Sequence, residues 1–189
     1  MHRRCALAAL LLPAPLLLSA CSSGLGDLPP IESSGPAVYR LGPGDEIRLA
    51  VFGFDQMSNS YTISDDGTIS LPLLSSVKAT GRTPPELETA IAGILRERQL
   101  APNASVSVQV MKYRPIYILG EVQKPGQYPY VPGMTVTTAV AIAGGYTFRA
   151  NQKAASVRRV TPAGGTQRRA GPNATILPGD TIRVPEAWF

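Results

Sequence analysis

The chain has very little histidine and cysteine, and both residue types are confined to its first 21 residues. The one histidine is His2, and the two cysteines are Cys5 and Cys21. Ser-His-Asp and Cys-His catalysis need a histidine beside the nucleophile, and zinc and copper sites rely mainly on His and Cys ligands. From residue 22 onward these mechanisms and ligands are excluded. We therefore expect a protein that is not an enzyme and has no metal or other cofactor.

The sequence also has no apolar run as long as the roughly 20 residues that a membrane-spanning helix needs. The longest run, Cys5–Leu18, follows a cationic start and precedes small residues that end at Ala20. A cationic start, an apolar stretch and a small-residue cleavage site are typical of a secretory signal peptide. We therefore predict a signal peptide over residues 1–20.

The residues around this cleavage site resemble the lipobox of bacterial lipoproteins, in which a cysteine becomes the acylated first residue. We predict cleavage between Ala20 and Cys21 and lipid on Cys21; an ordinary signal peptide with a chance cysteine is the alternative. Residues 21–37 are rich in Ser, Gly and Pro, which predicts a flexible lipidated linker. Asp is absent after the cysteine, which in lipoproteins favours transport to the outer membrane.

Residues 38–112 have the pattern of a small α+β unit. Apolar and polar residues alternate over Glu46–Val51 and again over Val106–Val110, as in strands with one buried face. Thr83 and Glu86 form the ends of a T-x-x-E capping box, after which apolar residues recur at helical spacing. We expect this helix to end at Pro102.

Two β-rich runs, Tyr61–Ser64 and Thr68–Leu71, flank the tripeptide Asp65-Asp66-Gly67. An Asp-Gly pair between such runs predicts a β-hairpin. The adjacent carboxylates of Asp65 and Asp66 also allow an envelope hydrolase. We favour the turn, because Asp and Gly are the residues that turn geometry prefers.

Residues 113–189 predict a second α+β unit. A strand at Ile116–Val122 is followed by Tyr128–Val131, which is expected to pair back with it. Thr135 can cap a short helix that Gly144-Gly145 would close. Two further strands are expected, Ala155–Val160 and Thr181–Val184. A hairpin, a helix and returning strands are the element order of a β-grasp unit.

A short internal echo links the two units. Leu41–Leu49 and Leu177–Val184 both contain a Pro-Gly-Asp turn that leads into an Ile-Arg strand. Favourable turn chemistry used twice and shared ancestry are two alternative explanations of the echo.

Charge is unevenly divided between the units. Residues 21–112 carry seven Lys and Arg against ten Asp and Glu, which gives −3, whereas residues 113–189 carry nine against three, which gives +6. An acidic partner for the second unit, such as anionic lipid, an anionic polymer or a protein, explains this asymmetry. A solvated basic face is the alternative.

Taken in order, these motifs resemble those of the outer-membrane polysaccharide export lipoproteins of capsule and exopolysaccharide secretion. The first unit carries motifs similar to the polysaccharide export domain: Tyr39–Phe52, Asp66–Pro72 and the helix after Thr83. The second carries motifs similar to the soluble-ligand-binding β-grasp (SLBB) domain: Ile118–Val122, Lys124–Gly126, Ala143–Gly145 and Leu177–Asp180. The resemblance implies an export domain over 38–112 and an SLBB domain over 113–189.

The resemblance also implies a function in transport. Such proteins form ring-shaped oligomers around a periplasmic channel and receive polymer from an inner-membrane copolymerase and its tyrosine kinase. The family brings no catalytic residues to carry over, so Cys21 is the only site residue that the resemblance assigns. Larger members continue past the first SLBB domain to a transmembrane helix, whereas this sequence stops at Phe189. We expect a short, lipid-anchored member that faces the periplasm, with a separate outer-membrane pore as a possible partner.

Aromatic side chains are candidates for contact with polymer, because their faces stack on sugar C–H groups. Tyr128 and Tyr130 are two residues apart, as on one face of a strand, and Tyr146 and Phe148 repeat the spacing. Tyrosines in a β-grasp sheet are more often core or interface residues, so we assign no polymer-binding residue. The alternative function is a monomeric carbohydrate-binding envelope lipoprotein that uses these tyrosines.

Overall fold

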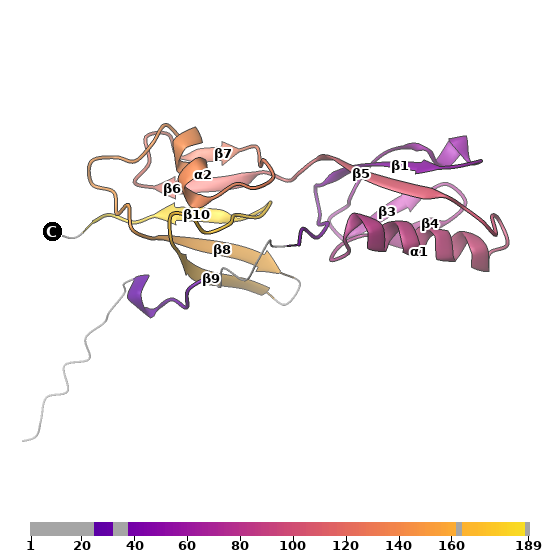
Figure 1. Ribbon diagram of the computed structural model, residues 1–189, viewed down its shortest axis with the longest axis horizontal. Helices are drawn as coiled ribbons and strands as arrows, with labels where there is room; N and C mark the ends of the chain where they lie inside the picture. The colour runs from indigo at the N-terminus through magenta and orange to yellow at the C-terminus, as the bar shows by residue number, and fades with distance from the viewer. Residues whose placement is uncertain (1–24, 32–37, 162–163, 188–189) are drawn as a thin grey trace, which may run out of the picture.

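The computed structural model describes residues 25–31, 38–161 and 164–187, and it contains two α+β units joined in series (Figure 1). The predicted α+β class is therefore confirmed. The predicted signal peptide, with its cleavage site at Ala20 and Cys21, lies outside the described residues and stays a prediction.

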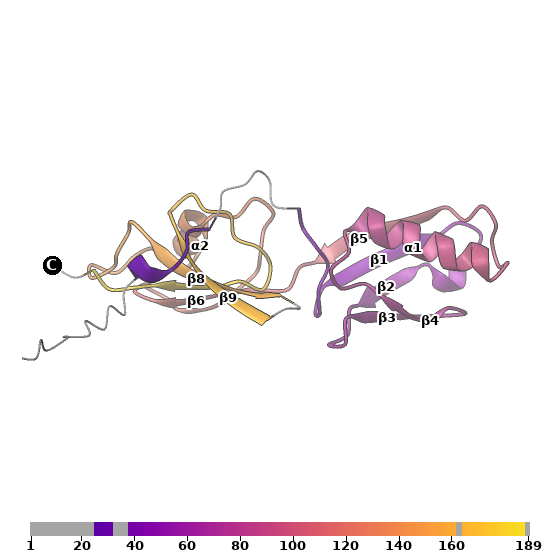
Figure 2. The ribbon, with the colours of Figure 1, turned by 90° about the horizontal axis from the view of Figure 1, so that it is seen from below.

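The first unit packs one helix and a small hairpin against a three-stranded antiparallel sheet of order β2-β1-β5. Its strands are β1 (Glu46–Val51), β2 (Asn59–Thr62), β3 (Thr68–Leu71), β4 (Ser75–Lys78) and β5 (Val106–Lys112). Its helix is α1 (Pro84–Glu97), and a short 3-10 turn, η2 (Asp55–Met57), follows β1. Figure 2 shows α1 on one side of this unit and the β3–β4 pair on the other.

The core of the first unit follows from the two periodicities in its sequence. Alternate residues of β1, ending at Val51, are buried, and Leu87, Ile91 and Leu95 of α1 are fully buried against them. Burial of each such side chain contributes about 1.5–3 kcal/mol. The predicted capping box is confirmed, because the Thr83 hydroxyl accepts from the Glu86 N–H and the Glu86 carboxylate accepts from the Thr83 N–H.

The end of α1 differs from the prediction. The helix ends at Glu97, five residues before Pro102, and Gln99 adopts φ +57°. The backbone N–H of Leu100 donates to the carbonyl of Leu95 at 3.0 Å, which completes a Schellman-type cap. Glycine usually occupies the left-handed position of this cap, so its absence removed the sequence signal.

The predicted hairpin around Asp65-Asp66-Gly67 is correct as a turn and wrong as a strand pair. The Gly67 N–H donates to the Ser64 carbonyl at 2.8 Å, which closes the turn. However, β2 pairs with β1, and β3 pairs with β4 in a separate two-stranded sheet. The β3–β4 connection uses positive φ at Leu73 and Ser75 instead of at a glycine, so the sequence carried no turn signal there.

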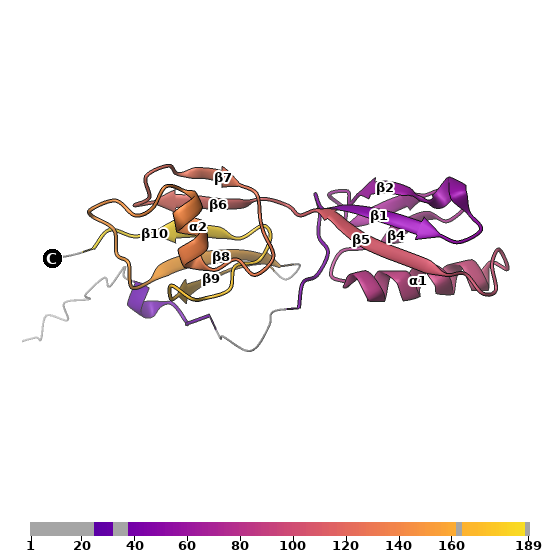
Figure 3. The same ribbon diagram turned by 45° about the horizontal axis from the view of Figure 1, so that its top comes forward.

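The second unit is a five-stranded sheet of order β7-β6-β10-β8-β9 with one helix on one side (Figure 3). Its elements are β6 (Ile116–Gly120), β7 (Gly126–Tyr128), α2 (Val136–Ile142), β8 (Ala155–Thr161), β9 (Gly164–Ala170) and β10 (Thr181–Val184). The first strand, β6, lies parallel to the last, β10, and the other pairs are antiparallel. This arrangement agrees with the predicted β-grasp unit.

Helix α2 packs its apolar residues into the core of the second unit. Val136, Ala139 and Val140 are buried in the second core beside Ile118 and Ile182. As predicted, Gly144 and Gly145 end the helix, with φ +86° and +92°. Among the described residues, no helix has both the length and the apolar character to cross a membrane.

Two features at the edge of this sheet were not predicted. Strand β9 has only Ala170 buried, so it lacks the apolar alternation by which the other strands were recognised. The segment before the first unit also pairs with β9: the Ile31 N–H donates to the Arg169 carbonyl at 2.7 Å, and the Arg169 N–H donates to Pro29 at 2.9 Å. Residues 29–31 therefore have fixed backbone partners, which the expectation of a flexible linker did not include.

Candidate functional site

The two Pro-Gly-Asp turns that echo each other in the sequence meet at the junction between the units. Gly44 and Gly179 have φ +86° and +84°, as a type II turn requires at its third position. Asp45 and Asp180, which follow them, are both fully buried. The connecting segment Tyr113–Pro115 passes between the two turns and bonds to both.

Asp45 is surrounded by hydrogen-bond donors. Its carboxylate accepts from the Gly42 N–H at 2.7 Å, from the Arg114 N–H at 2.9 Å and from Nη1 of Arg114 at 2.8 Å. The Tyr39 hydroxyl donates to the same carboxylate. A buried carboxylate is stable only when it is satisfied in this way, so Asp45 fixes the connecting segment against the first unit.

Asp180 repeats this arrangement in the second unit. It accepts from the Leu177 N–H, three residues earlier, at 2.8 Å, just as Asp45 accepts from Gly42. Nε and Nη2 of Arg159 donate to its two oxygens at 2.9 and 2.7 Å, which forms a bidentate pair. These bonds raise the pKa of Arg159 above its ordinary value.

Arg114 joins the two turns. Besides its contact with Asp45, its Nε donates to the Pro178 carbonyl at 3.0 Å, and the Gly179 N–H donates to Pro115 at 3.0 Å. A Cβ at Gly42 would lie 2.4 Å from Nη1 of Arg114, and a Cβ at Gly179 would lie 2.7 Å from its Nε. The two glycines therefore make room for one guanidinium between the units.

Three tyrosines continue this junction. Tyr113 makes edge-to-face contacts with Tyr39 and with Tyr130, at ring-centroid distances of 5.0 and 5.3 Å. Burial, and next the hydrogen bond to Asp45, raise the pKa of Tyr39. Burial also raises the pKa of Tyr130. The tyrosine row therefore connects the two cores through aromatic contacts.

A groove with a volume of about 580 Å³ opens beside these residues. Both turns line it, together with Arg114, Arg159 and the loop at Asp65 and Asp66. The hydroxyl oxygen of Thr80, which also lines the groove, is buried and has no hydrogen-bond partner in the described part of the chain. The groove is thus lined by carboxylates of the first unit and by guanidinium groups of both units.

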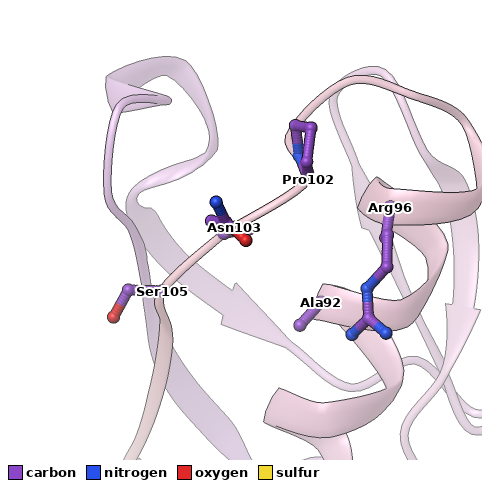
Figure 4. A pocket seen from close by; sticks show the side chains of 6 residues that line it. Ala92, Arg96, Pro102, Asn103 and Ser105 are labelled. Carbon is purple, nitrogen blue, oxygen red and sulfur yellow. The ribbon is translucent and has the colours of Figure 1, made fainter.

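A second cavity lies between α1 and the loop before β5 (Figure 4). Its lining includes one charged side chain, Arg96, with Asn103 and Ser105 on the facing loop. All of its lining comes from the first unit, so we take the groove at the junction as the candidate site.

The aspartates and tyrosines that the sequence analysis named as candidates lie in different parts of the structure. Asp66 accepts hydrogen bonds from the N–H and hydroxyl of Thr68 at 3.0 and 2.9 Å, which supports its role in the turn. Tyr128, Tyr130 and Tyr146 pack partly buried against the second core, and Tyr130 lies beyond the end of β7.

The fourth aromatic candidate, Phe148, is 92% exposed and lies in no strand. Phe148 therefore does not share a strand face with Tyr146 as their spacing predicted. No three His, Cys, Asp or Glu side chains within residues 25–31, 38–161 and 164–187 gather into a group that could hold a metal ion. Sequence reasoning missed Arg114, because its partners Asp45 and Pro178 are more than sixty residues away along the chain.

Two family models match the chain in tandem. The model of polysaccharide biosynthesis/export proteins matches residues 33–111, and the SLBB domain model matches residues 115–170. The interval between the matches contains Tyr113 and Arg114, the residues that join the two units in the structure.

Curated relatives carry related names. The exopolysaccharide production protein ExoF of Rhizobium meliloti is 33% identical over 88% of this chain and 46% of its own length. The EPS I polysaccharide export outer membrane protein EpsA of Ralstonia nicotianae is 36% identical over 54% of this chain and 27% of its own length. The polysialic acid transport protein KpsD of Escherichia coli is 27% identical over 57% of this chain and 19% of its own length.

The chain spans less than half the length of each of these relatives. The two matched regions nevertheless follow one another in the order that the motifs predicted. The chain belongs to the polysaccharide export protein family, with a polysaccharide export domain followed by an SLBB domain.

Proposed function

We propose that this protein is a subunit of a machine that exports capsular polysaccharide or exopolysaccharide across the cell envelope. The tandem match to an export domain and an SLBB domain carries the proposal. The relatives' names refer to exopolysaccharide production, polysaccharide export and polysialic acid transport, which supports transport and not catalysis. The export domain occupies residues 38–112 and the SLBB domain residues 113–189.

The protein is placed at the outer membrane, facing the periplasm, by lipid on Cys21. The lipobox-like residues that end at Ala20 support this location, as does the outer-membrane name of the Ralstonia relative. One acyl chain binds a membrane only marginally, so stable attachment needs more than one chain. Replacement of Cys21 by Ser should abolish incorporation of labelled fatty acid and release the protein from membrane fractions; unchanged incorporation would contradict lipidation at this residue.

The working form is a homo-oligomeric ring around a periplasmic channel. An inner-membrane copolymerase with its tyrosine kinase would supply the polymer, and a separate outer-membrane pore would complete the passage. A fixed angle between the two units supports this form, because a closed ring needs subunits of one shape. Arg114 supplies such a constraint through its bonds to both turns.

Deletion of the gene tests the proposed function. The amount of polysaccharide at the cell surface should fall to background, and the wild-type chain supplied on a plasmid should restore it. Normal surface polysaccharide in the deletion strain, with no second copy of the gene family present, would overturn the proposal.

A monomeric carbohydrate-binding lipoprotein is the second candidate function. The groove at the junction, with its buried Thr80 hydroxyl and its polar groups from both units, favours it. Particle mass of the detergent-extracted protein separates the candidates. A ring gives a mass many times that of one chain, which is 20.0 kDa before the signal peptide is removed, whereas a binding module gives the mass of a single copy.

A further inference from the structure

The sheet of the second unit has one side that no described element covers. Ile182 of β10 pairs with Ile118 of β6 and with Val157 of β8, and all three are buried on the side where α2 packs. Because successive side chains of a strand point to opposite sides, the intervening residues face away from α2. In Figure 2, α2 lies on one side of β6, β8 and β9 only.

Three arginines gather on this open side. Arg183 of β10 pairs with Ser156 of β8, which pairs in turn with Arg169 of β9, so these residues form one row across the sheet. Arg158 lies in the next row, opposite Thr181. Neighbouring strands are about 4.8 Å apart, so the backbones of Arg183 and Arg169 are about 10 Å apart. All three arginines are exposed.

Two apolar side chains complete the surface. Tyr117 and Leu119 of β6 pair with Thr181 and Arg183 of β10, and they are 42% and 46% exposed. We define the arginine face by five exposed residues of these rows, which are Tyr117, Leu119, Arg158, Arg169 and Arg183.

The guanidinium groups of this face have no carboxylate partner among residues 25–31, 38–161 and 164–187. The ion pairs of that part of the chain use other arginines, namely Arg40, Arg114, Arg149 and Arg159. Gly165 on β9 leaves room for Arg158, whose Nε lies 3.1 Å from the place where a Cβ of Gly165 would be. Arg159 is paired with Asp180 inside the protein, whereas the neighbouring Arg158 is available to pair with an external anion.

We propose that the arginine face binds the acid groups of an anionic polysaccharide, so that the exported polymer carries carboxylates or equivalent anions. The proposal rests on the proposed export function and names the chemical class of its cargo. Guanidinium groups pair with carboxylates in a planar, hydrogen-bonded geometry, and Tyr117 offers a ring on which a sugar can stack. The excess positive charge of residues 113–189, +6 against −3 for residues 21–112, has the sign that such a polymer requires.

The shape of the face favours a polymer over other acidic partners. Its guanidinium groups are spread over three adjacent strands, which suits a chain with an acid group in each repeat. Tyr117 and Leu119 are each less than half exposed, so these two side chains offer little apolar surface for insertion into a bilayer. Exposed ion pairs contribute little singly, so the face would hold a moving polymer through several weak contacts.

Binding to two polymers that differ only in charge tests the proposal. The purified full-length protein is titrated with polygalacturonate, which has a carboxylate on each sugar, and with its methyl ester, which has the same backbone without the charge. We expect polygalacturonate to bind and the ester to bind at least tenfold more weakly. Raising the salt concentration should weaken the binding of polygalacturonate, because exposed charges are screened.

A triple variant, R158Q/R169Q/R183Q, locates the binding. We expect polygalacturonate to bind about ten- to a hundredfold more weakly, from three exposed ion pairs. The matched control, R48Q/R96Q/K112Q, removes three exposed cations from the first unit and should bind as the wild type does. Circular dichroism with thermal unfolding verifies that both variants fold. The effect of salt on polygalacturonate binding is measured on the wild type, so it tests the proposal even if a variant does not fold.

Each other outcome overturns the proposal. Equal binding of polygalacturonate and its ester would exclude charge recognition, and equal loss in the two triple variants would exclude this face. Binding to vesicles that contain phosphatidylglycerol, without binding to polygalacturonate, would make the face a membrane contact. If the wild type does not bind the polymer and the triple variant changes in oligomeric mass, the arginine face is an interface between copies of the chain.

Failure here and failure of the proposed function are distinguishable. If deletion of the gene leaves surface polysaccharide normal, the export function is wrong whatever the purified protein binds. If deletion removes surface polysaccharide but the two probes bind alike, export stands and only the acidic class of the cargo is wrong.

Discussion

Asp45 and Asp180 are single residues that organise the junction between the units. Each is fully buried and accepts a backbone N–H from the turn that precedes it. Each also pairs with an arginine from a distant segment, Arg114 or Arg159. The sequence echo therefore corresponds to one local structure used twice.

Asp45→Asn should destabilise the protein by about 2–4 kcal/mol, because it leaves the partly buried Arg114 guanidinium without its counter-charge. Urea unfolding measures the change. Asp65→Asn is the control, since Asp65 is exposed in the next turn, and it should change the free energy of unfolding by less than about 0.5 kcal/mol. Equal stability of the two variants would contradict the role assigned to Asp45.

Tyr39 predicts a pH dependence at the alkaline end. Burial and the bond to Asp45 raise the pKa of Tyr39 above its value of about 10 in the unfolded chain. Its contribution to stability is therefore complete below about pH 10 and is lost as the pH rises further. In Tyr39→Phe the free energy of unfolding should fall less steeply above pH 10 than in the wild type. If the two slopes are equal, the ionisation of Tyr39 does not contribute to the loss of stability at high pH.

At the scale of elements, the sequence predicted best the structures whose signals are local. Both helices begin where a threonine and the residue three positions later form a capping box, at Thr83 and Thr135. The β3–β4 turn has its positive φ at Leu73, where sequence carries no such signal. Strand β9 is an edge strand whose exposed residues need no apolar alternation, so it was missed.

The candidate site was harder to predict than the helices. The Pro-Gly-Asp turns were visible as motifs, but their convergence on Arg114 depends on contacts across 64 and 69 residues of chain. The three arginines of the arginine face were visible only as a surplus of charge. Their arrangement on one side of the sheet depends on the strand register, which no local pattern specifies.

The pairing of residues 29–31 with β9 can be tested by hydrogen exchange. The amides of Ile31 and Arg169 both donate across this pairing and should exchange slowly. Ile31→Pro removes one donor, and we expect the Arg169 amide to exchange about five- to tenfold faster while Val157 in the sheet interior is unchanged. Fast exchange of Arg169 in the wild type would contradict the pairing.

At the scale of the whole molecule, we expect Arg114 to hold the angle between the units. Its guanidinium bonds to Asp45 in one unit and to Pro178 in the other, and two glycines leave it the space. The residues that follow Cys21 contain no cysteine, so a pair of spin labels can be introduced cleanly at exposed positions. Asp55 in the first unit and Phe148 in the second are suitable positions.

Arg114→Ala should broaden the distribution of distances between labels at these positions, as measured by pulsed electron spin resonance. Arg149→Ala removes an exposed ion pair with Glu186 inside the second unit and serves as the control, with an unchanged distribution. If the Arg114→Ala distribution stays as narrow as that of the wild type, the angle between the units is held by other contacts, such as the tyrosine row.

The location of polysaccharide in cells that lack the gene tests the central claim most directly. Polymer is extracted separately from the cell surface and from the periplasm of the deletion strain and of the same strain complemented with the wild-type chain. The export function predicts that surface polymer is lost without this chain and that any polymer still made is retained inside the envelope. Surface polymer at the level of the complemented strain, in the absence of a second gene of the family, would contradict it.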